Sequence, residues 1–235
     1  MSREDNFRQA GNPYAASQIP AQIYDDSLDG DLGNPLWSMW FHPRRTIRKI
    51  TATDPTLHVV LLTGLGGIVQ TLNRASTRST GDSISLPTII CLAVFLGPLS
   101  GLISLWIFSH LIRIEGNMIG GIGERENIKA AIAWSYLPGV FCLITWGISL
   151  LVFGSEMFTT ATPRIDSSST LLTLFLVIAF VEIVLGIWAF VLVCNAIAEV
   201  QGFYSAWSGL GNIILASLLI IVPLLALVFL FLLMA

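Results

Sequence analysis

Long apolar stretches almost free of charge are the feature that most constrains this chain. Lipid cannot satisfy backbone polar groups, so an apolar run of about 20 residues in a bilayer about 30 Å thick is expected to be a helix. Hydrophobic residues make up 54% of the sequence, charged residues 11%, and the mean hydropathy is +0.76. We therefore predict an all-α polytopic membrane protein with five transmembrane helices. The predicted spans are 57–72, 84–112, 130–153, 171–194 and 212–233.

The first predicted span is the weakest of the five. At about 1.5 Å per residue it covers about 24 Å, and it contains Gly64, Gly66 and Gly67. A re-entrant segment is the alternative to a full crossing.

The distribution of Lys and Arg beside the spans predicts the orientation, because cytoplasmic loops carry an excess of these residues. With a cytoplasmic N-terminus the C-terminus lies on the opposite side. The cytoplasmic segments then hold seven cations, namely Arg44, Arg45, Arg48, Lys49, Arg113, Arg125 and Lys129. The opposite side holds three, Arg74, Arg78 and Arg164.

Two polar segments precede the membrane region, which we place at 57–235. Residues 1–33 are rich in Asp, Gln, Pro and Gly, and we predict a disordered cytoplasmic tail. In residues 34–56, aromatic residues at i, i+3 and i+4 precede a basic cluster, which is typical of an interfacial amphipathic helix at the headgroups. An ordinary basic flank is the alternative. The anchor residues are Trp37, Trp40, Phe41, Arg44, Arg45, Arg48 and Lys49.

Small residues and prolines recur inside the spans. Gly97 and Gly101 form a GxxxG pair, and Ser135 with Gly139 forms a similar pair, which favours close helix packing. The sequence leaves open whether this packing is internal or builds a homo-oligomer. We also expect kinks where prolines interrupt spans. These prolines are Pro98, Pro138 and Pro223.

Glu182 is the one acidic residue near the centre of a predicted span. Intramembrane carboxyl groups are costly and often mark ion or proton pathways. The alternative is a protonated carboxyl group hydrogen-bonded across the bundle, because no intramembrane Lys or Arg is present to pair with it.

The sequence lacks the patterns that are typical of nucleic-acid, metal or nucleotide binding. The net charge of −3 argues against nucleic-acid binding, and the three Cys and three His residues show no metal-ligand spacing. The glycine clusters at 63–67 and 116–124 lack the GK[ST] ending of a phosphate loop. We therefore predict no catalytic site, metal or cofactor.

The predicted last cytoplasmic loop offers a different kind of site. Glu199, Gln201, Tyr204 and Trp207 lie close together in sequence there, and with GGIGERENIK they form a candidate polar face for a partner. A plain solvated loop is the alternative.

Three stretches give the chain a family resemblance. They are MWFHPRRTIRKITATDP, GGIGERENIKAAIAWSYLPG and NAIAEVQGFYSAWSGLGNIILA, so that roughly residues 36–235 are covered. The chain resembles the Yip family, the Ypt/Rab-interacting proteins, in its bacterial-type branch. The residues that match the family pattern include Pro43, Pro55, Gly120, Gly121, Tyr136, Pro138 and Gly202.

The resemblance implies five helices, a cytoplasmic N-terminus and a role in membrane organisation or trafficking. Eukaryotic relatives associate with Rab-type GTPases, but the Asp-rich tail matches no GTPase-binding region. We predict a non-enzymatic membrane protein that binds lipid and partner proteins, and a small transporter or channel using Glu182 is the alternative. The absence of any Asn-x-Ser/Thr sequon fits a bacterial cytoplasmic (inner) membrane, with the ER or Golgi membrane as the alternative.

Overall fold

The computed structural model describes residues 32–234, with side chains described to residue 229, and within this range all regular structure is helical. All but two residues of the predicted tail (1–33) lie outside the described range. Residues from Asn34 onward form one compact unit. The elements are α2 (Pro35–Phe41), α3 (Pro43–Thr53), α4 (Val59–Thr77), η1 (Thr80–Asp82), α5 (Leu86–Met118), α6 (Arg125–Ser135), α7 (Leu137–Val152), η2 (Gly154–Phe158), α8 (Pro163–Ser167), α9 (Ser169–Val200) and α10 (Ala206–Met234).

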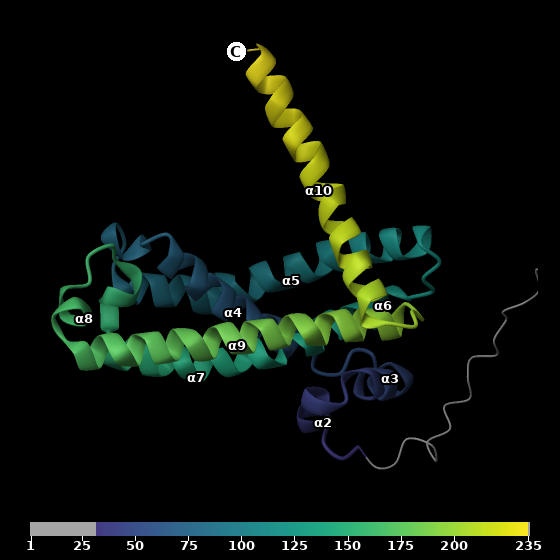
Figure 1. Cartoon of the computed structure of the whole chain (residues 1–235), viewed down its shortest axis with the longest axis horizontal. Coiled ribbons are helices and arrows are strands. Elements are labelled where there is room, and N and C mark those ends of the chain that lie inside the picture. The colour runs from purple at the N-terminus through teal and green to yellow at the C-terminus, as the bar shows by residue number, and fades with distance from the viewer. Residues whose placement is uncertain (1–31, 235) are drawn as a thin grey trace, which may run out of the picture. The chain divides into compact units, whose positions relative to one another are not determined.

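The long helices run back and forth between two ends. At the end that we call the α8 end, η1, η2 and α8 join the C-termini of α4 and α7 to the N-termini of α5 and α9. At the other, called the α10 end, α3 and the N-termini of α6 and α10 meet the C-terminal parts of α5 and α9. Figure 1 shows α8 close to one end of α9 and α6 close to the other.

Four helical segments are long and apolar enough to cross a membrane: Leu86–Met118, Arg125–Val152, Ser169–Val200 and Ala206–Phe229. A multi-pass helical membrane protein is therefore confirmed in outline. The first of the five predicted spans, 57–72, corresponds to α4, which also runs from the α10 end to the α8 end. The second half of α4 carries Gln70, Asn73 and Arg74, which makes the helix too polar to qualify as a membrane span by its composition. A fifth crossing therefore stays a prediction.

The helices extend beyond most of the predicted boundaries. At 33 and 32 residues, α5 and α9 are each about 50 Å long, well above the thickness of about 30 Å of a hydrocarbon core. In α9 the buried residues are concentrated between Leu192 and Ala198. Those residues belong to a packed region at the α10 end, whereas the apolar residues nearer the α8 end are mostly exposed, as on a surface that faces lipid.

The three intramembrane prolines have different consequences. Pro138 lies in the first turn of α7, and the chain breaks between α6 and α7 at Tyr136. Helices α5 and α10 continue through Pro98 and Pro223. Pro138, which lacks the amide hydrogen that the preceding turn would need, lies where one helix ends and the next begins, whereas a kink at Pro98 or at Pro223 stays a prediction.

Helices α4 and α5 cross with their backbones in close contact. A Cβ atom on Gly101 would lie 2.6 Å from the Thr63 carbonyl oxygen, and one on Gly97 would lie 2.8 Å from the Ile68 Cα. A Cβ atom on Gly67 would overlap the Gly97 carbonyl group. Only glycine allows this approach, as in small-residue contacts between membrane helices.

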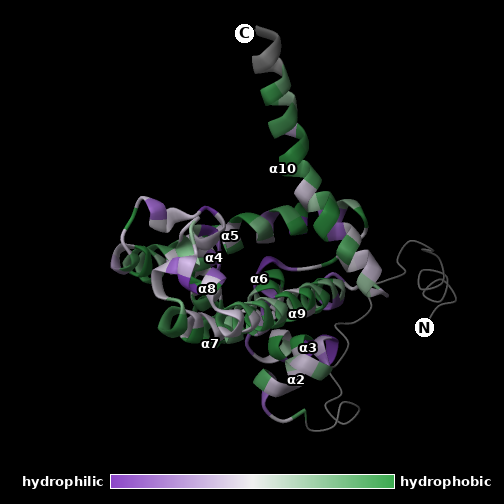
Figure 2. Ribbon diagram, turned by 60° about the vertical axis from the view of Figure 1, so that its left-hand side comes forward, coloured by the Kyte–Doolittle hydropathy of each residue, from purple (hydrophilic) through white to green (hydrophobic). Residues whose placement is uncertain are grey.

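Helix α10 packs against α5 and α9 only through its first turns. Asn212 and Ala216 are buried, whereas residues 218–229 are all exposed. The outer part of α10 extends away from the other helices in Figures 1 and 2, and Figure 2 shows hydrophobic residues along it. An apolar helix exposed in this way is suited to a lipid environment.

Candidate functional site

The three segments that carry the family resemblance meet at the α10 end. Helix α3 packs on α9 and α6, and the loop after α5 lies against the loop after α9. The Ile122 amide donates a hydrogen bond to the Gln201 carbonyl oxygen at 3.1 Å, which joins the two loops directly.

Gln201 is the centre of a buried polar network. Its side-chain nitrogen Nε2 donates to the Ile112 carbonyl at 3.0 Å and to Asn212 Oδ1 at 3.1 Å. Its oxygen Oε1 accepts from the Gly123 amide at 2.9 Å, and Asn212 Nδ2 also donates to Ile112. Gln201 is 1% exposed and Asn212 is 0% exposed. Gln201 is therefore not part of a solvated loop, because its amide fastens α5, α10 and both loops together.

The glycines of the loop after α5 make room for this amide group. Cβ atoms on Gly121 and Gly123 would lie 2.5 Å and 2.7 Å from Gln201 Oε1. Gly120 and Gly202 have positive φ angles of 87° and 73°, which side chains rarely adopt. The family-motif glycines thus serve the turn geometry and the packing of Gln201 rather than a phosphate.

Glu199 holds the basic helix α3 onto the end of α9. Its carboxylate accepts from Arg44 Nε at 2.9 Å and from Arg48 Nε at 2.6 Å. Arg44 also donates to the carbonyl oxygens of Tyr204 at 2.8 Å and of Phe203 at 2.5 Å. At least two of the four cations predicted to meet lipid headgroups therefore bind the end of this protein's own α9, and Arg44 also binds the loop that follows it.

Replacing Glu199 with Gln should loosen α3 without unfolding the protein. The Glu199 side chain is 12% exposed and the arginine side chains are 32% and 49% exposed, so solvent screens both pairs and a loss of about 1 kcal/mol is expected. Amide hydrogen exchange in α3 should then be about fivefold faster.

The matched control for this variant is Glu126→Gln. Glu126 pairs with Lys129 within α6 and is 53% exposed. Its loss should leave exchange in α3 unchanged, and equal acceleration in both variants would show that Glu199 does not hold α3.

The predicted aromatic anchor is divided. A break at His42 precedes Pro43, which begins α3, and separates α3 from α2. Trp37 and Phe41 are exposed on α2, whereas Trp40 packs edge-on against Phe141 with ring centroids 5.4 Å apart. Trp37 and Phe41 remain available to the headgroup region, and Trp40 serves the packing of α2 on the membrane helices.

An exposed apolar group surrounds the two joined loops. It consists of Met118, Ile119, Ile122, Tyr204 and Trp207, and we call it the loop patch. Tyr204 is 98% exposed and Ile122 and Trp207 are each 79% exposed. Since the loops themselves are fixed by Gln201, the patch is presented on a rigid base.

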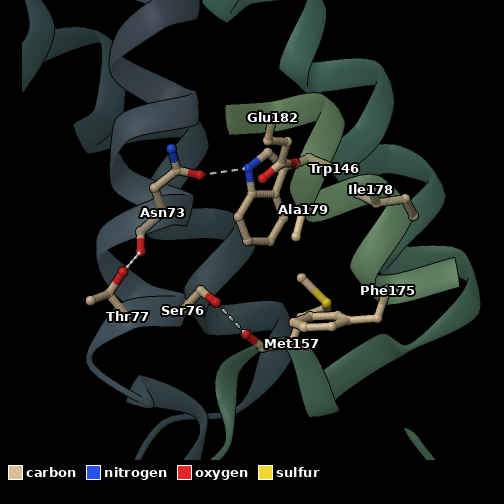
Figure 3. A pocket seen from close by; sticks show the side chains of 9 residues that line it. All are labelled: Asn73, Ser76, Thr77, Trp146, Met157, Phe175, Ile178, Ala179 and Glu182. Carbon is tan, nitrogen blue, oxygen red and sulfur yellow. Dashed lines mark hydrogen bonds between the residues drawn. The ribbon is translucent and has the colours of Figure 1, made fainter. Parts of the chain in front are cut away.

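A second site lies near the α8 end, in a cavity of about 290 Å³ between α4, α7, η2 and α9. Figure 3 shows Glu182 of α9 and Asn73 of α4 on either side of the Trp146 indole ring of α7. Trp146 Nε1 donates to Asn73 Oδ1 at 2.8 Å, and Thr145 Oγ1 donates to Glu182 Oε1 at 2.6 Å. Glu182 thus faces neighbouring helices, as a carboxyl group in a membrane should.

The remaining residues singled out in the sequence lie in local structural roles. Tyr136 lies over Gly66, where a Cβ atom would be 3.2 Å from the ring, and Pro55 lies in the turn before α4. Ser135 Oγ donates to the Ala131 carbonyl, but a Cβ atom on Gly139 would meet no atom within 4 Å. The predicted close packing at Gly139 is thus not made within the described part of the chain.

Charged side chains at the α8 end join loops. Asp82 accepts hydrogen bonds from the Thr160 hydroxyl at 2.6 Å and from the Thr160 amide, and both bonds lower the pKa of this exposed carboxyl group below its ordinary value.

In residues 32–234 no group of three His, Cys, Asp or Glu side chains is arranged to hold a metal ion.

Comparison with known proteins identifies the family. The family model described as the Yip1 domain matches residues 37–233. The chain belongs to the Yip1 domain family. Comparisons with curated proteins and with solved structures found no match. The match includes α3, Gln201 and the helices up to α10, so the whole assembly at the α10 end lies inside the Yip1 domain.

Proposed function

We propose that this Yip1-domain protein is a non-enzymatic membrane protein that organises membrane or binds partner proteins through the loop patch at the α10 end. The observation that carries the proposal is the Gln201 network. The buried side-chain amide of Gln201 holds two loops in place through its hydrogen bonds. These loops therefore need little ordering when a partner binds, which lowers the free-energy cost of binding.

The position of the loop patch supports a protein partner over lipid tails. Since α5 and α9 are each about 50 Å long, they exceed a hydrocarbon core of about 30 Å, and we place the excess at the α10 end, where they carry Arg113, Glu115 and Glu199. Aromatic and aliphatic side chains on a rigid base outside the hydrocarbon are typical of protein interaction sites. In the orientation predicted from the Lys and Arg distribution, this end is cytoplasmic, and we place the protein in a bacterial cytoplasmic membrane.

Photo-crosslinking in native membranes tests this proposal. A photoreactive amino acid in place of Tyr204 or Trp207 should give discrete protein adducts. The same residue in place of Leu151, which is 89% exposed on α7 near the α8 end, should give none of these adducts. Only lipid adducts at all three positions would contradict a partner-binding role and favour an interfacial anchor.

The cavity beside Glu182 keeps a small transporter or channel as a second candidate. Such a protein should support a flux in proteoliposomes that the Glu182→Gln variant lacks. The non-enzymatic proposal instead expects that variant to insert and bind partners normally.

A further inference from the structure

We propose that the cavity beside Glu182 is a binding site for a small organic ammonium ion, an amine that carries a short apolar or aromatic group. This inference concerns binding within the bundle and does not depend on the partner proposed for the loop patch.

Most hydrogen-bond donors of the cavity are already used; the exception is Asn73 Nδ2, which has no acceptor among the described residues. Trp146 Nε1 donates to Asn73 Oδ1, and the Thr145 hydroxyl donates to Glu182. The Ser76 hydroxyl donates to the Met157 carbonyl at 2.6 Å, and the Thr77 hydroxyl donates to the Asn73 carbonyl at 2.8 Å. At Glu182 a complementary ligand must therefore supply the hydrogen, whereas at Asn73 Nδ2 the protein can still donate one.

The charge of the cavity also favours a cation. Glu182 is its only lining residue with an ionisable carboxyl group, and no Lys or Arg lines it. One oxygen of this group accepts from Thr145, and the second has no protein donor among the described residues. A carboxylate at this depth needs a counter-charge, because a bare charge within a membrane is costly. An ammonium group beside Glu182 would supply it.

Aromatic rings complete the site. The Trp146 ring is stacked on Phe158 with centroids 5.4 Å apart, which fixes its orientation. Figure 3 shows the Phe175 ring and the Met157 sulfur at the other side of the cavity from Asn73. Aromatic faces attract cations and pack against apolar groups. A volume of about 290 Å³ lies near the lower limit for ligand pockets, so the ligand is small.

Direct binding of radiolabelled phenethylammonium to the detergent-purified full chain tests the inference. Wild-type protein should bind it saturably. Unlabelled 2-phenylethanol, which is neutral, and 3-phenylpropionate, which is an anion, should compete at least about tenfold more weakly than unlabelled phenethylammonium, because neither supplies a charge-assisted hydrogen bond to Glu182. This comparison requires no mutation.

Glu182→Gln should weaken binding by about tenfold or more, and Asp166→Asn is the matched control. Asp166 lies in α8, is exposed and does not line the cavity, so its loss changes the charge equally and should leave binding intact. Equal competition by the alcohol, unchanged binding in a monodisperse Glu182→Gln protein or no saturable binding to wild type would each overturn the proposal.

Discussion

Gly67→Val should lower the melting temperature of the detergent-purified protein by about 10 °C. Its Cβ atom would overlap the Gly97 carbonyl group, so the backbones of α4 and α5 must move apart. Forcing extra volume into a packed contact costs about 1–3 kcal/mol, and more where only backbone can yield. For a protein of this size, about 3 kcal/mol corresponds to a shift of this order. Thermal unfolding followed by size-exclusion chromatography gives the measurement.

Gly147→Val is the matched control for the α4–α5 crossing. A Cβ atom on Gly147 would meet nothing within 4 Å, so this variant should unfold within a few degrees of wild type. Similar losses in both variants would show that glycine in these helices matters for a reason other than the close approach of α4 to α5.

Gln201→Leu should destabilise the protein by about 2–5 kcal/mol. The substitution removes the acceptor of the Gly123 amide and the donor to Asn212 Oδ1, leaving both groups buried without these bonds. An unsatisfied buried polar group costs about 1–3 kcal/mol. Denaturant titration in mixed micelles, monitored by tryptophan fluorescence, would measure the loss. The crosslinks at Tyr204 and Trp207 should weaken in the same variant.

Two comparisons separate the network from the loss of a polar side chain. Gln70→Leu changes an exposed amide on α4 and should have little effect. The double variant Gln201→Leu with Asn212→Leu should lose less stability than the sum of the single variants. Asn212 Oδ1, which Gln201→Leu alone leaves without its donor, is itself absent from the double variant. Additive losses would contradict a coupled network.

The sequence is sufficient for the helical class because its signal is local. Apolar runs define α5, α9 and α10, although each extends past the predicted boundary. In α5 the charged residues Arg113 and Glu115 ended the prediction, yet the helix continues to Met118, and its last turns are packed at the α10 end, where Ile112, Glu115 and Gly116 are buried.

Long-range partners are what the sequence does not reveal. Gly97 and Ser135 each begin a small-residue pair, but only the Gly97–Gly101 pair makes close backbone contact with another helix, since a Cβ atom on Gly139 would meet nothing within 4 Å. Nothing in the local sequence distinguishes the two pairs. In the sequence Gln201 precedes Gly202, and the pattern predicts a loop there. Its hydrogen-bond partner Ile112 lies 89 residues away, so the sequence does not show that Gln201 is buried. Glu199 is likewise paired with Arg44 across 155 residues.

Thiol labelling from either side of the membrane tests the central claim most directly, that the chain spans the bilayer with the α10 end cytoplasmic. Cys91, Cys142 and Cys194 are first replaced by Ala, and Tyr204→Cys or Ala161→Cys is then introduced at an exposed position of each end. With an impermeant maleimide, Tyr204→Cys should react only in inside-out vesicles and Ala161→Cys only in right-side-out vesicles. Reaction of both from the same side, or of Tyr204→Cys from the outside alone, would contradict it.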